Sequence, residues 1–388
     1  MYKYSGYLRK DGSIGIRNYV AVIPTVGCVN EVASRIATQV DGAVPILHHQ
    51  GCCQLKPDVD TVTRVLEGIG KNPNVVGVLL VSLGCEAVDT KEIEKHLKML
   101  KPTYSICLQK LGGITKTVER GINIVQSLVS NITNTTKEVN LNSLVVGLKC
   151  GASDATSGIA SNPAVGVAVD KLIENGATVI FGETTEVLGA EEVLAKRAVT
   201  AEIASGILKK IEEMEHRAKS MGVDMRGSQP TPGNIRGGLT TIEEKSLGAI
   251  IKSGTKPING VLEYGEQPSD CGLYFMDTPG REIEVLTGLA SGGCQLILFT
   301  TGVGAPQGFP LCPVIKISGN KNTCLNLKEH IDIDVSTIIS GEETIIQAGE
   351  RIFREILEVA SGKKVKAELL GYDKNGINID IYTKGPVI

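Results

Sequence analysis

The chain has 388 residues, with 40 Lys and Arg against 43 Asp and Glu, a formal net charge of −3. This near balance, an aromatic content of 4% and the absence of Trp argue against a nucleic-acid-binding protein. No apolar run reaches the roughly 18 residues of a membrane helix, and the first residues lack the apolar core of a signal peptide. We therefore expect a cytoplasmic protein of two domains that contacts neither nucleic acid nor membrane.

Strand-like apolar runs alternate with helical patterns in the first half of the chain. The runs cover residues 19–26, 43–47, 74–83, 103–109, 143–149 and 177–183. Such alternation is typical of a parallel sheet covered by helices on both faces. The Gly- and Pro-rich segment 226–238 predicts a linker, after which mixed patterns resume. The sequence predicts an α/β protein of two Rossmann-like, doubly wound domains with mostly parallel sheets, residues 1–225 and 239–388, with the site in the cleft between them.

In a cytoplasmic chain we expect the ten cysteines to form no disulfide framework, and no Cys-x-x-Cys pair occurs. Four strand-like runs end in a cysteine beside a glycine. These are Cys28, Cys52, Cys85 and Cys150. Because the carboxyl ends of parallel strands share an edge, we predict that the four thiols converge there and bind iron, as Fe²⁺ or an iron–sulfur cluster. The alternative is that they are small, half-buried hydrophobic residues.

Further polar residues follow the predicted strands. His48 is a candidate base or metal ligand, because imidazole titrates near neutral pH, whereas a hydrogen-bonded structural role is preferred for His49. The Gly-rich turn 151–163 offers hydroxyl and backbone N–H groups to an anion, although a capped helix start explains it equally well. Glu183 and Glu186 follow the next strand, and their alternative role is to complement a helix dipole.

Several motifs, taken in order along the chain, carry a resemblance to a known family. They are GIRN, PTVGCVN, HHQGCCQL, SLGCE, CGASDATSGIASNP, GETTEVLGAE, TPGNIRGGLTTIEEKSLG and LFTTGVGAP. Together they resemble the altronate and galactarate dehydratases, which dehydrate sugar acids using iron. The resemblance implies a hydro-lyase of carbohydrate acid metabolism that converts a 2,3-dihydroxy carboxylate to a 2-oxo-3-deoxy acid. A base would take the C2 proton while a Lewis acid stabilises the developing charges.

The resemblance also assigns residues, including the four cysteines as metal ligands. The expected catalytic residues are His48, Glu86, Asp154, Glu183, Glu186 and Lys245. The expected substrate-binding residues are Arg17, Asn18, Ser153, Asn162, Asn234 and Val303. Val303 stands where the sugar-acid enzymes have Arg, which predicts a substrate shorter or less hydroxylated than altronate or galactarate. The alternative is that another cation, such as Arg17 or Lys245, pairs with the substrate carboxylate.

The chain begins directly at the catalytic region of this family. It therefore resembles the large subunit of a split enzyme, which implies a small SAF-domain subunit as partner and an oligomeric assembly. One alternative is a sulfo-lyase that eliminates sulfite from sulfolactate, which belongs to the same superfamily. The other is a non-catalytic iron–sulfur subunit of a larger assembly. The retained cysteines favour dehydration.

Overall fold

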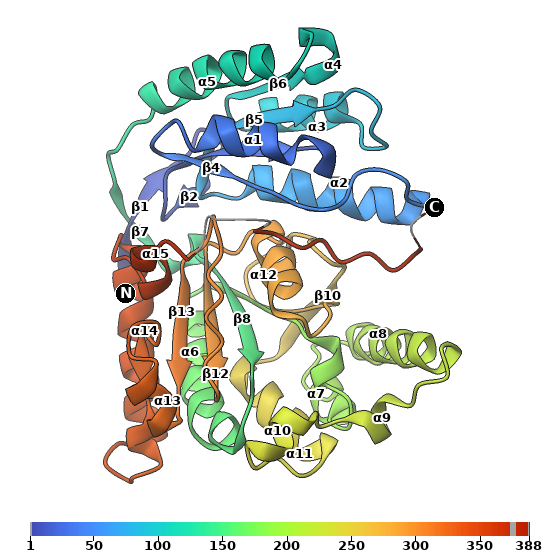
Figure 1. The fold of residues 1–388 in the computed structure, drawn as a ribbon. Coiled ribbons are helices and arrows are strands. Elements are labelled where there is room, and N and C mark those ends of the chain that lie inside the picture. Colours follow the sequence, from blue (N-terminus) through green and yellow to red (C-terminus); the bar gives the residue numbers. More distant parts are fainter. Residues whose placement is uncertain (1, 373–377, 387) are drawn as a thin grey trace.

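The computed structural model describes residues 2–372, 378–386 and 388, and these form two α/β units joined by a small antiparallel sheet (Figure 1). The smaller unit contains a four-stranded parallel sheet in the order β4-β3-β5-β6. Its strands are β3 (Tyr19–Pro24), β4 (Ala43–Pro45), β5 (Val75–Ser82) and β6 (Thr103–Cys107). Its helices are α1 (Asn30–Ala37), α2 (Lys56–Lys71), α3 (Thr90–Lys98), α4 (Leu108–Leu111) and α5 (Ile114–Ser130).

Strand β5 shows why this unit folds as a covered sheet. Its side chains alternate between two apolar clusters: Val78 and Leu80 pack with α2 and α3, whereas Leu79 and Val81 pack with α1 and α5. A strand that buries both faces in this way needs a nearly continuous apolar run, which the sequence supplies.

The larger unit contains a seven-stranded parallel sheet in the order β10-β11-β9-β8-β12-β13-β14. Its strands are β8 (Val145–Gly151), β9 (Thr178–Phe181), β10 (Ile258–Leu262), β11 (Leu273–Met276), β12 (Leu296–Thr301), β13 (Val314–Ser318) and β14 (Ile333–Asp334). Its helices are α6 (Asn162–Glu174), α7 (Glu191–Ala195), α8 (Ala201–Ser220), α9 (Met225–Ser228), α10 (Pro232–Arg236), α11 (Ile242–Ile250), α12 (Glu282–Ser291), α13 (Lys321–Asn326), α14 (Ile345–Ala360) and α15 (Lys366–Leu370). Helices α6 and α14 cover one face of this sheet, while α12 covers the other.

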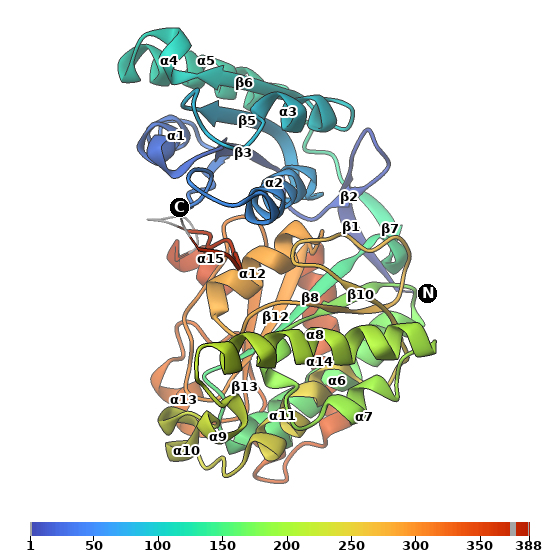
Figure 2. The ribbon, with the colours of Figure 1, turned by 90° about the vertical axis from the view of Figure 1, so that its right-hand side faces the viewer.

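The two units share one apolar cluster, because α2 of the smaller unit packs directly on α12 of the larger one (Figure 2). Polar groups reinforce this interface. The Asn72 side chain donates to the carbonyls of Ala290 and Cys294, at 2.8 and 2.9 Å, and the Asn74 side chain donates to those of Gln295 and Leu311, both at 2.8 Å. Carbonyl groups at the end of α12 and in the loops beside it thus accept hydrogen bonds from the other unit.

The ends of the chain also join the units. Strand β1 (Lys3–Leu8) pairs antiparallel with β2 (Ile14–Gly15) and with β7 (Lys137–Asn140), the segment that leads from one unit to the other. Residues 378–386 run back along the interface, where Asn378 N donates to Leu47 O at 3.2 Å and Lys384 Nζ donates to Asp277 at 2.6 Å.

The parallel, doubly covered sheets confirm the predicted fold class, but the predicted domain boundary is wrong. Strands β8 and β9, which precede segment 226–238, pair with β12 and β11, which follow it, so this segment separates no sheets. It contains the short helix α10, in which Pro232 and Gly233 lie and whose start is capped by Thr231. Among the described residues, no helix combines the length and apolarity that a membrane span requires.

Candidate functional site

Three of the motifs meet at the carboxyl edge of the larger sheet. Residues 151–161 follow β8, Glu183–Glu186 follow β9 and residues 302–305 follow β12, and these three strands are neighbours. Val303 N donates to Ala152 O at 2.9 Å, which joins two of the loops directly. The expectation that they face each other across a cleft between two domains is therefore wrong, because all three belong to one sheet, at the edge where ligands of α/β proteins gather.

A buried cluster of charges lies beneath this edge. Glu183 is fully buried and accepts hydrogen bonds from Lys149 Nζ, from Lys252 Nζ at 3.0 Å and from Cys150 N at 2.9 Å. Burial acts to raise the pKa of the Glu183 carboxyl, but the Lys149 and Lys252 charges outweigh it and hold the pKa below its ordinary value. Glu183 is therefore a fixed negative charge.

Glu186 has the opposite character. Burial and the nearby Glu183 charge raise the pKa of its carboxyl, although Lys252 acts against them. Its Oε2 atom has no hydrogen-bond partner among the described residues, while Lys252 Nζ lies 3.8 Å from Oε2 and Lys245 Nζ lies 4.0 Å from Oε1. A carboxyl group with a raised pKa and a free oxygen is a stronger base than an ordinary carboxylate and is a candidate for proton transfer.

A pocket of about 140 Å³ opens beside this cluster. It is lined by Cys150, Ser153, Asp154, Ala155, Ser157, Gly158, Ile159, Asn162, Leu239, Glu244, Lys245, Gly248 and Ala249. Cys150 Sγ lies 3.1 Å from Ser153 Oγ and 3.5 Å from Asn162 Nδ2, and burial raises the pKa of its thiol. The pocket therefore presents a protonated thiol, hydroxyl and amide groups, one ammonium group, and the carboxyl groups of Asp154 and Glu244.

Asp154 and Asn234, two further predicted residues, hold the loops in place. The Asp154 carboxylate accepts from Thr156 Oγ1 and from Asn320 Nδ2, both at 2.7 Å, and the Asn234 side chain donates to Ser153 O at 2.9 Å. The structure thus brings Ser153, Asp154, Asn162 and Lys245 together around the pocket, with Asn234, Glu183 and Glu186 packed beside them.

The four predicted cysteines are divided between the two sheets. Cys28, Cys52 and Cys85 are exposed and follow β3, β4 and β5 of the smaller unit, whereas Cys150 is buried at the end of β8 in the larger unit. The prediction of one shared rim is therefore wrong, because local sequence did not reveal that β8 joins the other sheet. Among the described residues, no group of three or more His, Cys, Asp and Glu side chains is arranged to hold a metal ion. Iron binding therefore stays a prediction.

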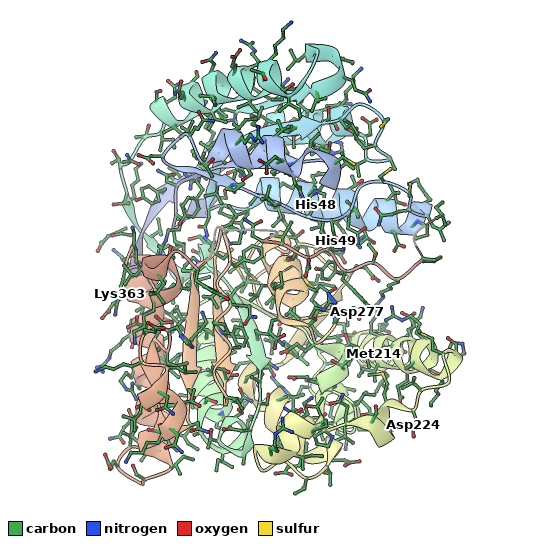
Figure 3. The ribbon with its side chains drawn as sticks, in the orientation of Figure 1. His48, His49, Met214, Asp224, Asp277 and Lys363 are labelled. Carbon is green, nitrogen blue, oxygen red and sulfur yellow. The ribbon has the colours of Figure 1, made fainter. Side chains whose placement is uncertain are left out.

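His48 and His49 lie where the two units meet (Figure 3). His48 is fully buried, its Nδ1 accepts from Gln50 N at 3.1 Å and its Nε2 donates to Pro24 O at 2.7 Å. Burial lowers the pKa of His48 to about 4, so the ring is neutral with both nitrogens occupied. His49 is the more exposed of the two, with Nδ1 3.5 Å from Asp380. His48 is therefore a structural residue, and His49 is held as well, with its Nε2 2.8 Å from Gln50 Nε2.

Glu86 shapes the loop that carries Cys85. Its carboxylate accepts from Thr25 Oγ1 at 3.0 Å, from Thr90 Oγ1 at 3.1 Å and from Gly84 N at 2.6 Å. This network places Glu86 in the smaller unit, apart from the pocket residues.

Arg17 and Asn18 do not reach the pocket either. The Arg17 guanidinium donates to both Glu368 oxygens, at 2.7 and 2.8 Å, and to three backbone carbonyls, so no donor is left for a substrate. Asn18 is held by Arg9 and by residues 133–134. The alternative that Arg17 pairs with the substrate carboxylate, in place of an Arg at position 303, is therefore wrong. Lys245 is the remaining candidate for that role.

Sequence reasoning missed three residues of the site. Lys149 and Lys252 are buried and neutralise Glu183, and Ser246 Oγ is buried without a hydrogen-bond partner among the residues described. A lysine inside the apolar run SLVVGLK was a signal for Lys149, because a buried ammonium group requires a partner. Lys252 and Ser246 gave no such signal.

Two family models match the chain. The model described as D-galactarate/altronate dehydratase, C-terminal, matches residues 141–382, and that described as D-galactarate dehydratase/altronate hydrolase, second domain, matches residues 6–133. The chain belongs to the D-galactarate/altronate dehydratase family. Its two matched segments coincide with the larger and the smaller unit.

Individual members of the family resemble the chain over most of its length. The beta subunit of (2R)-sulfolactate sulfo-lyase from Chromohalobacter salexigens is 36% identical, covering 95% of both chains. Altronate dehydratase from Bacillus subtilis is 32% identical, covering 94% of this chain and 75% of the relative. Galactarate dehydratase (L-threo-forming) from Escherichia coli is 35% identical, covering 94% and 73%.

The raised pKa of Glu186 predicts how stability depends on pH. As the pH rises above about 4.5, Glu186 loses its proton in the unfolded chain but keeps it in the folded protein. Because the unfolded state then binds fewer protons, Glu186 lowers the free energy of unfolding as the pH rises. We expect Glu186→Gln to be more stable than the wild type at about pH 8, with the difference shrinking toward about pH 5. Urea unfolding at several pH values measures this. Glu243→Gln, an exposed change near the start of α11, is the control, and a pH-independent difference for Glu186→Gln would contradict the prediction.

Proposed function

We propose that the chain is the catalytic subunit of a hydro-lyase that dehydrates a short 2,3-dihydroxy carboxylate to a 2-oxo-3-deoxy acid. The observation that carries this proposal is Glu186, a buried carboxyl with a raised pKa and an unpartnered oxygen, beside the pocket at Cys150 and within 4.0 Å of Lys245. Membership of a dehydratase family supports the same reaction class.

The elimination has two chemical needs, and the site offers groups for both. The C2 proton of a hydroxy acid is weakly acidic, so its removal requires a base stronger than an ordinary carboxylate, which a raised pKa makes of Glu186. Lys245 lines the pocket and can pair with the substrate carboxylate, where it stabilises the charge that builds up as the proton leaves. The electrons of the C2–H bond form the C2–C3 double bond, the C3 hydroxyl leaves with a proton as water, and the enol product becomes the 2-oxo acid.

The neighbouring groups have supporting roles in this proposal. Ser153 and Asn162 line the pocket and can hydrogen-bond the substrate hydroxyls. Glu183 remains ionised between its two lysines and keeps the pKa of Glu186 raised.

Site variants test this assignment. Loss of a general base typically costs about 10²- to 10⁴-fold, so Glu186→Gln should lower kcat by that order, whereas Lys245→Gln should mainly raise KM. Steady-state assays with and without a co-expressed small subunit measure both values. The control Glu243→Gln should retain activity, and an active Glu186→Gln enzyme would remove Glu186 from the role of base.

A second candidate function is the elimination of sulfite from a sulfonated hydroxy acid. It is favoured by the sulfo-lyase beta subunit, which matches this chain over 95% of both lengths, whereas the dehydratases are longer. The same C2 proton is removed, and only the leaving group differs. The description of that relative as a subunit also supports our proposal that the chain works with a second, small subunit.

Val303 predicts which substrates are accepted. Its side chain is 57% exposed on the loop beside the pocket and donates no hydrogen bond, so C3–C5 hydroxy acids or sulfolactate should be better substrates than C6 sugar acids. Val303→Arg should raise kcat/KM for C6 acids by about 10- to 100-fold, the worth of one charged hydrogen bond. Comparative steady-state assays check this. A wild-type enzyme that prefers altronate or galactarate would overturn the prediction.

Iron remains part of the proposal through the family resemblance alone, and no step above depends on it. We expect protein purified without oxygen to contain iron bound by Cys28, Cys52 and Cys85, with loss of most of the metal in Cys52→Ser. Metal analysis and EPR spectroscopy measure this. Cys271→Ser, an exposed cysteine of the larger unit, is the control, and wild-type protein that neither contains nor takes up iron would refute the assignment.

A further inference from the structure

The loop between β4 and α2 carries two adjacent thiols. Cys52 and Cys53 are both exposed, and their Sγ atoms lie 3.5 Å apart. The proposed reaction uses neither sulfur. Thiols at the surface are within reach of oxidants in solution, and a thiol with a second thiol beside it can form a disulfide before it is oxidised further. The pair is therefore a candidate for reversible oxidation.

A backbone turn brings the two sulfur atoms together. Side chains of adjacent residues point to opposite sides of an extended chain, so a contact between them requires a turn. Gly51 has a φ of 108° and Cys53 has a φ of 54°, both in the left-handed region. A cysteine rarely adopts this conformation, because its Cβ atom crowds the backbone there, so surrounding contacts have to hold it.

Contacts on both sides of the turn supply that support. Gly51 O accepts from Ala87 N at 3.0 Å, and Cys53 O accepts from Ile388 N at 2.9 Å. A Cβ atom at Gly51 would lie only 2.3 Å from Thr25 O, so the turn packs directly on the residue that follows β3. The chain thus holds the two thiols side by side from three separate segments.

The adjacency of the two cysteines also determines what kind of disulfide they can form. The peptide bond between Cys52 and Cys53 is trans, and Cα atoms across such a bond are about 3.8 Å apart. Ordinary disulfides join Cα atoms roughly 4.4–6.8 Å apart, so a disulfide between these residues is strained and easily reduced. A bond of this kind serves a reversible modification and joins no distant segments of the fold.

We propose that Cys52 and Cys53 form a site of reversible oxidation by peroxides. One thiolate attacks hydrogen peroxide, which gives a sulfenic acid and hydroxide, and the hydroxide takes up the proton of that thiol to become water. The second thiol displaces the sulfenic hydroxyl as another water molecule, and the S–S bond forms. Two thiols are thereby oxidised and one peroxide is reduced, and a thiol reductant reverses the change by exchange.

The disulfide has two chemical consequences. It protects both sulfur atoms from irreversible oxidation to sulfinic and sulfonic acids. While it persists, Cys52 cannot act as a thiolate ligand. The site is separate from the pocket at Cys150 and does not rest on the proposed reaction.

Peptide mapping after peroxide treatment tests the proposal. The full chain is purified without oxygen, freed of metal with a chelator, exposed to hydrogen peroxide, labelled with N-ethylmaleimide and digested with trypsin. Tryptic peptide 36–64 contains Cys52, Cys53 and no other cysteine, whereas Cys28 lies in peptide 18–35. We expect peptide 36–64 to carry no maleimide and to be lighter than the reduced peptide by two hydrogen atoms. Dithiothreitol should restore the labelling of both cysteines.

Matched variants make the outcome decisive. Cys53→Ser lacks the second thiol, so peroxide should convert Cys52 to sulfinic or sulfonic acid in at least about tenfold higher yield than in the wild type. If this variant does not fold, Cys52→Ser replaces it, with Cys53 as the sulfur that is followed. Cys271→Ser, which changes an exposed cysteine of the larger unit, should form the disulfide as the wild type does.

Three results would overturn the proposal. The first is a disulfide that links peptide 36–64 to another cysteine peptide, such as the one with Cys28. The second is full maleimide labelling of Cys52 and Cys53 after peroxide treatment. The third is a wild-type peptide in which acids that dithiothreitol does not reduce predominate.

Discussion

The carboxylate of Glu183, held between Lys149 and Lys252, is the interaction on which the candidate site depends. Replacing it would leave Lys149 and Lys252 without the carboxylate that they share, and breaking a buried ion pair in this way typically costs about 3–5 kcal/mol. The same group joins β8, the turn after β9 and the residues that follow α11, so it fixes the three segments that surround the pocket. Its charge also raises the pKa of Glu186. One buried carboxylate therefore sets both the shape of the site and its proton chemistry.

Much of the fold could be predicted from local sequence. Apolar runs such as the one that became β5 identify strands buried on both faces, and the Gly-rich turn after Cys150 was recognised as a possible ligand site. Strand order could not be predicted in this way. The pairing of β8 with β12 joins residues about 150 positions apart, and no local pattern encodes such a choice. The errors in the domain boundary and in the four-cysteine rim both follow from this one limitation.

The role of a side chain could be predicted only where a charged residue stands inside an apolar segment. Lys149 inside an apolar strand requires a buried partner, and that partner is Glu183. His48 and His49 are identical in type and adjacent in sequence, so only the structure shows that His48 is buried with both nitrogens bonded. Arg17 illustrates the reverse case. A cation near a motif suggests substrate binding, yet Glu368 and three backbone carbonyls occupy all of its donors.

The C-terminal segment has a mechanical consequence. Lys384 Nζ donates to Asp277 in the larger unit, at 2.6 Å, while Lys384 N donates to Asp58 at the start of α2, at 2.9 Å. The other oxygen of Asp277 accepts from Thr184, the residue after Glu183, at 2.8 Å. A rotation of the smaller unit that preserved these hydrogen bonds would displace the C-terminal segment, and with it the turn that carries Glu183 and Glu186. A continuous chain of hydrogen bonds thus connects α2 of the smaller unit with the turn that carries Glu183 and Glu186.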